Sequence, residues 1–242
     1  PDDVAALRGT GDAYAAQEQW EQAADWYRKW AQIAPDDVEA LKRVGGAYEA
    51  QEQWQQAADW YEKWTQVVPD DAEARLKLGW TYYQLEDFEQ AAAEFDRVTS
   101  LDPAWVEGWS GLGQSRYSLG QCESALGPLT EWRQLAPDLP EPRGLIGRCY
   151  LRLERFEDAV AEFQELTELD PADPGGYEGL GYAYYRVQDY ADALPAFQEW
   201  ARLAPDLAQA QGMVGWAAFR TGDYNRAIDA FTQALDIEER AG

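Results

Sequence analysis

Apolar residues recur along this chain with helical spacing, in a pattern that repeats every 34 residues. In the second repeat, Leu41, Val44 and Tyr48 lie three and four residues apart, and Tyr61 and Trp64 resume this spacing after a polar break. Each repeat therefore predicts two amphipathic helices of about 12 to 14 residues, joined by a short polar turn.

One glycine, one alanine and one proline return at fixed places in the repeat. The glycines are Gly11, Gly45, Gly79, Gly113, Gly147, Gly181 and Gly215. The alanines are Ala23, Ala57, Ala91, Ala125, Ala159, Ala193 and Ala227. Because a glycine inside a helix costs about 1 kcal/mol relative to alanine, its return predicts that two helices pack closely there. The prolines, from Pro35 to Pro205, lack an amide hydrogen and are expected to end each repeat.

The residues at these positions resemble the tetratricopeptide repeat. In two of the repeats the matching residues are Trp109, Leu112, Gly113, Ala125 and Pro137, and Tyr177, Leu180, Gly181, Tyr184, Ala193, Phe197 and Pro205. The resemblance implies an all-α fold, a right-handed superhelical solenoid of helix-turn-helix repeats. It also implies that the first helices line a concave groove in which peptides or partner proteins bind.

The array is expected to span residues 1–242 as a single domain of seven repeats, within a fragment of a longer chain. The repeats start near residues 4, 38, 72, 106, 140, 174 and 208. The last repeat ends near Ile237 without a further amphipathic helix, although terminal repeats usually carry a polar cap over the last apolar face. Two explanations stay open: the parent chain continues, or another molecule covers this end.

Tryptophan stands where the tetratricopeptide repeat usually has a small residue. These tryptophans are Trp30, Trp64, Trp132 and Trp200. They follow the buried stripe of the second helix, so we expect them to fill the contacts between repeats. Trp26 and Trp60 precede the buried Tyr27 and Tyr61 and should lean outward. They form either a second, convex contact surface or rings half-covered by neighbouring side chains.

The chain carries 20 basic and 45 acidic residues, which gives a net charge of −25. Phosphate backbones and anionic lipid surfaces would be repelled over most of the surface, so neither nucleic acid nor membrane is an expected partner. Only four of the basic residues are lysines, a balance compatible with a salt-rich habitat. Self-association remains compatible with this composition.

Catalytic chemistry has little support in this sequence. The chain has no histidine, and it contains no nucleophile motif or glycine-rich phosphate loop, so we expect neither an enzyme nor a cofactor. Cys122 and Cys149 lack the spacing of a metal site, and no metal is expected. Both cysteines are expected to be buried thiols, and stacked hairpins could also make them neighbours.

Aromatic and basic residues gather on the expected groove from the third repeat onward, at the ninth, twelfth and thirteenth positions of the first helix. The candidate partner-binding residues are Trp80, Tyr83, Tyr117, Arg148, Arg152, Tyr182, Tyr185, Arg186, Trp216 and Arg220. In one interpretation the arginines hold a carboxylate while the rings cover apolar side chains of a ligand. In the other, the rings stack on one another and the arginines pair with Glu107, Glu141 and Glu178.

Two functions remain open at this point. The first is a scaffold or adaptor module that binds a peptide or protein segment in the groove, one with an acidic or carboxylate terminus fitting the arginines. The second is a structural subunit that assembles with itself or within a complex, through its uncapped end and the convex surface of Trp26 and Trp60.

Overall fold

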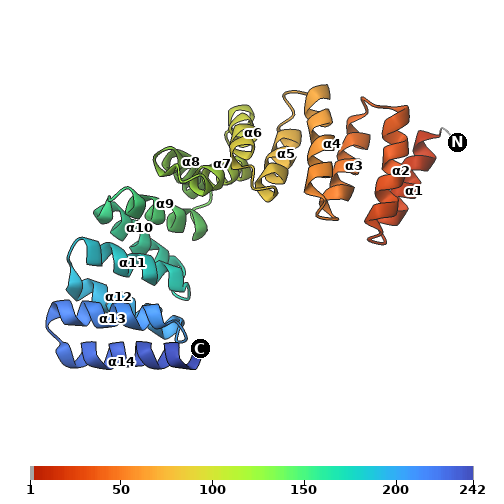
Figure 1. Cartoon of the computed structure of the whole chain (residues 1–242). Coiled ribbons are helices and arrows are strands. Elements are labelled where there is room, and N and C mark those ends of the chain that lie inside the picture. The colour runs from red at the N-terminus through yellow and green to blue at the C-terminus, as the bar shows by residue number, and fades with distance from the viewer. Residues whose placement is uncertain (1–2, 242) are drawn as a thin grey trace. The chain divides into compact units, whose positions relative to one another are not determined.

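The computed structural model describes residues 3–241, which form 14 α-helices and no strand (Figure 1). Two consecutive helices form one hairpin, and we call them the first and the second helix of that hairpin. The first helices are α1 (Val4–Ala15), α3 (Val38–Glu49), α5 (Ala72–Gln84), α7 (Val106–Ser118), α9 (Glu141–Arg152), α11 (Pro174–Arg186) and α13 (Ala208–Thr221). The second helices are α2 (Trp20–Ile33), α4 (Trp54–Val67), α6 (Phe88–Leu101), α8 (Cys122–Leu135), α10 (Phe156–Leu169), α12 (Tyr190–Leu203) and α14 (Tyr224–Ala241).

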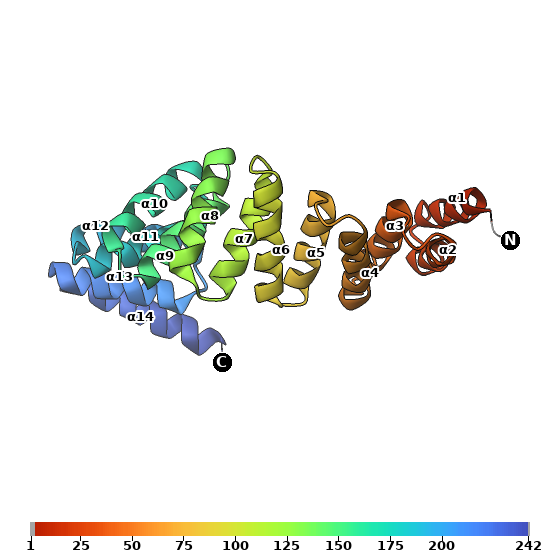
Figure 2. The ribbon, with the colours of Figure 1, turned by 90° about the horizontal axis from the view of Figure 1, so that it is seen from above.

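The helices form two compact units, one ending at Gln121 and the other beginning at Cys122. The first unit contains α1 to α7 and the second contains α8 to α14. Within each unit, every helix packs against the helices that precede and follow it in the chain (Figures 1 and 2). The expectation that all seven repeats form a single domain stays a prediction. No helix in the described part combines the length and apolar character needed to cross a bilayer.

In six of the hairpins, an aromatic ring of the second helix packs directly on the repeated glycine of the first helix. A Cβ atom on Gly45 would lie only 2.4 Å from Cε1 of Tyr61. The other pairs are Gly11 with Tyr27, Gly79 with Phe95, Gly147 with Phe163, Gly181 with Phe197, and Gly215 with Phe231. Any side chain at this position would clash with the ring, so glycine is required for the two helices to pack this closely.

Buried tryptophans hold successive hairpins together. Trp30, Trp64, Trp132 and Trp200 are all buried, which confirms their predicted place in the core. Trp30 donates its indole N–H to Asp37 at 3.1 Å, and Asp37 also accepts the backbone N–H of Glu39 at 3.0 Å, which caps α3. Trp64 and Asp71 repeat this arrangement at the start of α5. One carboxylate thus caps a helix and satisfies a buried indole donor.

The turns inside the hairpins require left-handed backbone. Five non-glycine residues have φ between 56° and 65°, namely Glu18, Glu52, Glu86, Glu154 and Gln188. Gly120 and Gly222 take this place in two other turns. Because a side chain in this region costs about 1 kcal/mol or more, tight packing of the flanking helices must hold these turns in place.

Alanine at Gly45 and alanine at Gly46 are expected to have opposite effects. Gly45→Ala forces Tyr61 to move and should lower the free energy of unfolding by about 1 to 3 kcal/mol. Gly46→Ala is the matched control, because a Cβ atom there meets only the Tyr61 hydroxyl oxygen at 3.9 Å and helix propensity improves by about 1 kcal/mol. Urea unfolding followed by circular dichroism measures both changes. Equal midpoints for the two variants would contradict the ring-on-glycine contact.

Candidate functional site

The first-helix face comprises the side chains at the second, fifth, ninth, twelfth and thirteenth positions of the first helices. In the first unit, tyrosines of the second helices reach this face. The Tyr27 hydroxyl donates to Asp12 at 2.7 Å, and the Tyr61 hydroxyl donates to Glu49 at 2.5 Å. Burial raises the pKa of Tyr27 to about 12, with Asp12 adding to the shift, and burial also raises the pKa of Tyr61. Both hydroxyls therefore remain hydrogen-bond donors.

Ion pairs connect α1, α3 and α5 along the edge of this face in the first unit, where Arg43 and Lys77 occupy the sixth position of their repeats. Arg43 lies 3.3 Å from Asp12 and 2.7 Å from Glu39, and Lys77 lies 3.1 Å from Glu49. All five side chains are between one-third and two-fifths exposed, so each pair contributes about 1 kcal/mol or less to stability. The basic groups of this region are thus already matched by carboxylates of the same chain.

A hollow of about 560 Å³ opens between these charged side chains. Ala15, Ala16 and Gly46 leave the space, while Lys42, Arg43 and Lys77 are among the charged residues around it. The helical pattern of the sequence does not predict this hollow. The available signal was the small size of the residues at three groove positions, which the helical pattern alone does not distinguish from ordinary surface.

Three predicted binding residues, Trp80, Tyr83 and Tyr117, lie in the first unit and are all half-buried. Trp80 meets Phe95 edge-on with ring centroids 4.9 Å apart, and Tyr83 meets Phe88 in the same way at 5.2 Å. Trp80 and Tyr83 therefore stack on the second helix of their own hairpin and remain partly exposed.

The remaining predicted rings, Tyr182, Tyr185 and Trp216, lie in the second unit. Tyr182 packs on Phe197 at 5.5 Å, and Tyr185 packs on Tyr190 at 5.0 Å. Trp216 is 50% exposed. Tyr182 and Tyr185 therefore stack on rings of the second helix of their hairpin rather than on each other, and Trp216 remains an exposed aromatic surface.

Two predicted arginines of the second unit lie over rings of the preceding hairpin. The guanidinium carbon of Arg186 lies 4.3 Å from the centroid of Phe156, and that of Arg220 lies 4.2 Å from the centroid of Tyr190. Arg186 also lies 3.4 Å from Glu154, and its side chain remains 52% exposed. These cation–π contacts join neighbouring hairpins and leave guanidinium edges accessible.

The other two predicted arginines, Arg148 and Arg152, are exposed on α9. Burial raises the pKa of Glu178, and the positive charge of Arg148 opposes this shift. Arg148 thus interacts with Glu178, as the second interpretation expects, whereas Arg186 lies beside Glu154 rather than any of the glutamates that this interpretation names.

Charge is unevenly divided between the first and second helices of the second unit. The first helices α9, α11 and α13 carry five arginines and two glutamates. The second helices α8, α10, α12 and α14 carry four arginines and 13 carboxylates. One of the five, Arg143, is 15% exposed and pairs with Glu165 away from the first-helix face. Within a chain of net charge −25, the remaining four arginines make the first-helix face of this unit locally cationic.

Trp26 and Trp60 are half-buried on the second helices of the first unit. Lys29 lies 3.9 Å from the ring centroid of Trp26, and Lys63 lies 3.7 Å from that of Trp60. Trp60 also packs against the cores of both the first and the second hairpins. These contacts match the interpretation in which neighbouring side chains half-cover the two rings.

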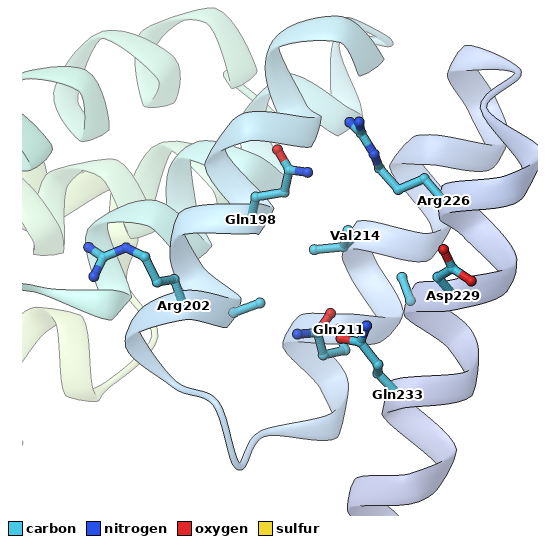
Figure 3. Close-up of a pocket in the computed structure, with 9 residues that line it drawn as sticks. Gln198, Arg202, Gln211, Val214, Arg226, Asp229 and Gln233 are labelled. Atoms are coloured by element: carbon cyan, nitrogen blue, oxygen red, sulfur yellow. The ribbon is translucent and has the colours of Figure 1, made fainter.

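A second hollow, of about 380 Å³, lies between α12, α13 and α14 (Figure 3). The charged and amide side chains around it are Gln198, Arg202, Gln211, Arg226, Asp229 and Gln233. Gln211 and Ala230 occupy the repeat positions that Leu41 and Trp60 fill in the second hairpin.

A carboxylate is buried in the second unit at the same repeat position as Trp60. Glu162 of α10 pairs with Arg133 of α8, and its other carboxylate oxygen accepts no hydrogen bond from the described residues. Burial raises the pKa of Glu162, and Arg133 opposes the shift only in part. The ionised form of this side chain therefore costs stability.

The two cysteines are buried neighbours. Cys149 and Cys122 are both free thiols, and they interact through a side-chain hydrogen bond. Burial raises the pKa of Cys149, with Cys122 adding to the shift, so the thiol form is favoured. Among residues 3–241, no group of histidine, cysteine and acidic side chains has the arrangement of a metal site.

Models of the tetratricopeptide repeat match most of this chain. One model matches residues 1–38, 145–208 and 178–241, which together exceed half of the sequence, and another matches residues 48–114. No curated protein matches the sequence.

Solved structures share the fold at low sequence identity. YrrB, a tetratricopeptide repeat (TPR) protein with an unusual peptide-binding site, is 20% identical to this chain, with a TM-score of 0.70. The match covers 77% of this chain and 96% of the YrrB chain. A MamA structure is 21% identical, with a TM-score of 0.68 over 72% of this chain and 94% of its own. MamA from Desulfovibrio magneticus RS-1 is 19% identical, with a TM-score of 0.65 over 72% and 98%. The predicted all-α solenoid of helix-turn-helix repeats is confirmed.

Glu162→Gln is expected to stabilise the chain increasingly as pH rises. The folded state binds the Glu162 proton more tightly than the unfolded state does, so stability falls as pH rises from about 4.3 through the raised pKa. Glutamine removes this loss, and the advantage over the parent chain should reach a plateau at higher pH. The control is Glu168→Gln, at an exposed position of the same helix. Urea unfolding across this pH range measures the difference, and an advantage independent of pH would contradict the assignment.

Proposed function

The chain belongs to the tetratricopeptide repeat family, and on that premise we propose that it binds a peptide or protein segment on the first-helix face of its second unit. Proteins of this family generally mediate protein–protein contacts and complex assembly, as typically non-catalytic modules. The proposed ligand is a segment that carries carboxylates, at its terminus or along its length, together with apolar side chains.

The cationic character of the first helices in the second unit carries this proposal. An acidic segment is repelled by a chain of net charge −25 almost everywhere, but the first-helix face of the second unit presents four arginines against two glutamates. Guanidinium groups hold carboxylates through paired hydrogen bonds, and the 52% exposure of Arg186 leaves donors accessible. Beside them, Trp216 and Phe219 are 50% and 48% exposed and can cover apolar side chains.

The corresponding face of the first unit supports the proposal less well. Its hollow is large enough for side chains of a ligand, but Arg43 and Lys77 already pair with carboxylates of the same chain. A ligand carboxylate would have to displace these partners, and the exchange would yield little net free energy. The peptide-binding site of YrrB shows that this fold can hold a peptide, without placing one here.

Two variants with the same net charge test the proposal by affinity capture from native lysate. The first changes four arginines of the first-helix face to alanine, Arg148, Arg152, Arg186 and Arg220. The matched control changes four exposed arginines of second helices to alanine, Arg97, Arg202, Arg226 and Arg240. The parent chain and the control should recover the same partner, and the first variant should bind it at least about tenfold more weakly.

Salt provides a further readout in the same experiment, because charge-assisted contacts weaken as ionic strength rises. Helicity of both variants is checked by circular dichroism. Equal recovery of the partner by the first variant and the control would refute the first-helix face as the binding site.

A further inference from the structure

The last helix, α14, exposes a continuous apolar stripe. Tyr224, Ile228 and Leu235 are 60%, 63% and 60% exposed, and their spacing of four and seven residues places them on one side of the helix. Half-buried Phe231 lies on the same stripe. Large apolar side chains exposed in a row usually mark a contact surface.

The same repeat positions are covered in other hairpins. Ala24 and Ala31 of α2, which correspond to Ile228 and Leu235, are only 3% and 4% exposed because α3 packs over them. In α12 the corresponding residues, Leu194 and Ala201, are likewise buried under α13. The stripe on α14 is therefore the surface that a following first helix would cover.

We propose that α1 of a second copy of this chain covers this stripe, so that copies associate end to end. In α3 the residues that face the preceding second helix include Ala40, Val44 and Ala47, all buried. Their counterparts in α1 are Ala6, Thr10 and Ala13, of which both alanines are exposed and Thr10 is partly exposed. The chain thus carries both halves of an inter-hairpin contact, each of them uncovered.

Gly9 of α1 and Phe231 of α14 complement each other in the same way as two pairs inside the chain. Phe95 packs on Gly111 of the following hairpin, where a Cβ atom would lie 2.5 Å from the ring. Phe163 packs on Gly179 in the same way, at 2.3 Å.

Gly9 holds the repeat position of Gly111 and Gly179, yet a Cβ atom on it would meet nothing within 4 Å. A glycine inside a helix costs helix stability, and within this chain nothing packs on Gly9 to offset that cost. The ring of Phe231 from a second copy would pack on Gly9 and provide that contact. This repeat position is not always glycine: Met213 holds it after Phe197, and Arg43 and Lys77 hold it after Tyr27 and Tyr61.

Charge favours the same pairing. The face of α1 formed by Ala6, Gly9, Thr10 and Ala13 bears no charge, and neither does the stripe on α14. In a chain of net charge −25, two surfaces without carboxylates can meet with little repulsion. The hydroxyl of Thr10 donates to the carbonyl of Ala6 at 2.8 Å, so burial would leave no unpaired donor. Thr81, bonded to Lys77 in the same way, is already buried.

The proposed contact joins two different surfaces. An assembly of copies therefore keeps one free α1 face at one end and one free α14 stripe at the other. Such heterologous contacts generate open chains of copies unless their geometry closes a ring. One helix pair buries less surface than a typical stable interface, so assembly should be concentration-dependent rather than permanent.

Two variants on opposite ends of the chain test the proposal. Ile228→Glu places a charge in the stripe on α14, and Gly9→Leu fills the space on α1 that Phe231 requires. Their controls are Asn225→Glu and Ala5→Leu, at exposed positions of the same helices. Light scattering from micromolar to millimolar concentration, with salt added to screen the net charge, measures the mean mass.

The mean mass of the parent chain and of both controls should rise with concentration. Each test variant alone should remain at the mass of a single chain. An equimolar mixture of the two test variants should form a dimer and nothing larger, because one intact α14 then meets one intact α1. Circular dichroism checks that the variants remain helical, and Gly9→Leu is expected to keep or increase helicity.

Three results would overturn the proposal. The first is a parent chain of constant single-chain mass at every concentration. The second is assembly that Ile228→Glu abolishes and Gly9→Leu leaves unchanged, which indicates contact between two α14 helices. The third is a mixture of the two test variants that forms no dimer.

Discussion

The contact between an aromatic ring and a helical glycine is the interaction on which the rest of this structure depends. Phe95 packs on Gly79 of its own hairpin and on Gly111 of the next, so one side chain connects three helices. Each hairpin is thus stabilised mainly by its immediate neighbours. Phe231 packs on Gly215 of its own hairpin, and among the described residues no following helix covers α14, so the last helix exposes apolar surface.

Because the ring and glycine positions form the framework, the first-helix face is free to differ between units. In the first unit, it holds ion pairs and buried tyrosine hydroxyls that bind carboxylates, as Tyr27 binds Asp12. In the second unit, it holds exposed arginines, two of which lie over rings of the preceding hairpin. The first surface pairs its basic groups internally, whereas the second keeps exposed guanidinium groups and half-exposed rings.

Much of this fold could be predicted from the period of the sequence, since helical spacing and a recurring glycine specify which sides of the helices pack. The buried Trp30 and Trp64 follow from the same phase. The left-handed turns could not be predicted, because glutamate stands where glycine is the ordinary choice, as at Glu86. Nor could the hollow of the first unit, because helix position specifies the direction of a side chain but not the space that neighbouring side chains leave open.

Hydrogen exchange of backbone amides, measured where the chain is monomeric, tests most directly the claim that a ring packed between two helical glycines protects its helix more than a ring packed on one. The central turns of α10 and α14 provide the comparison, because Phe163 packs on Gly147 and Gly179 whereas Phe231 packs on Gly215 alone. The account predicts that the centre of α14 exchanges markedly faster than the centre of α10. Equal protection in the two helices would contradict it.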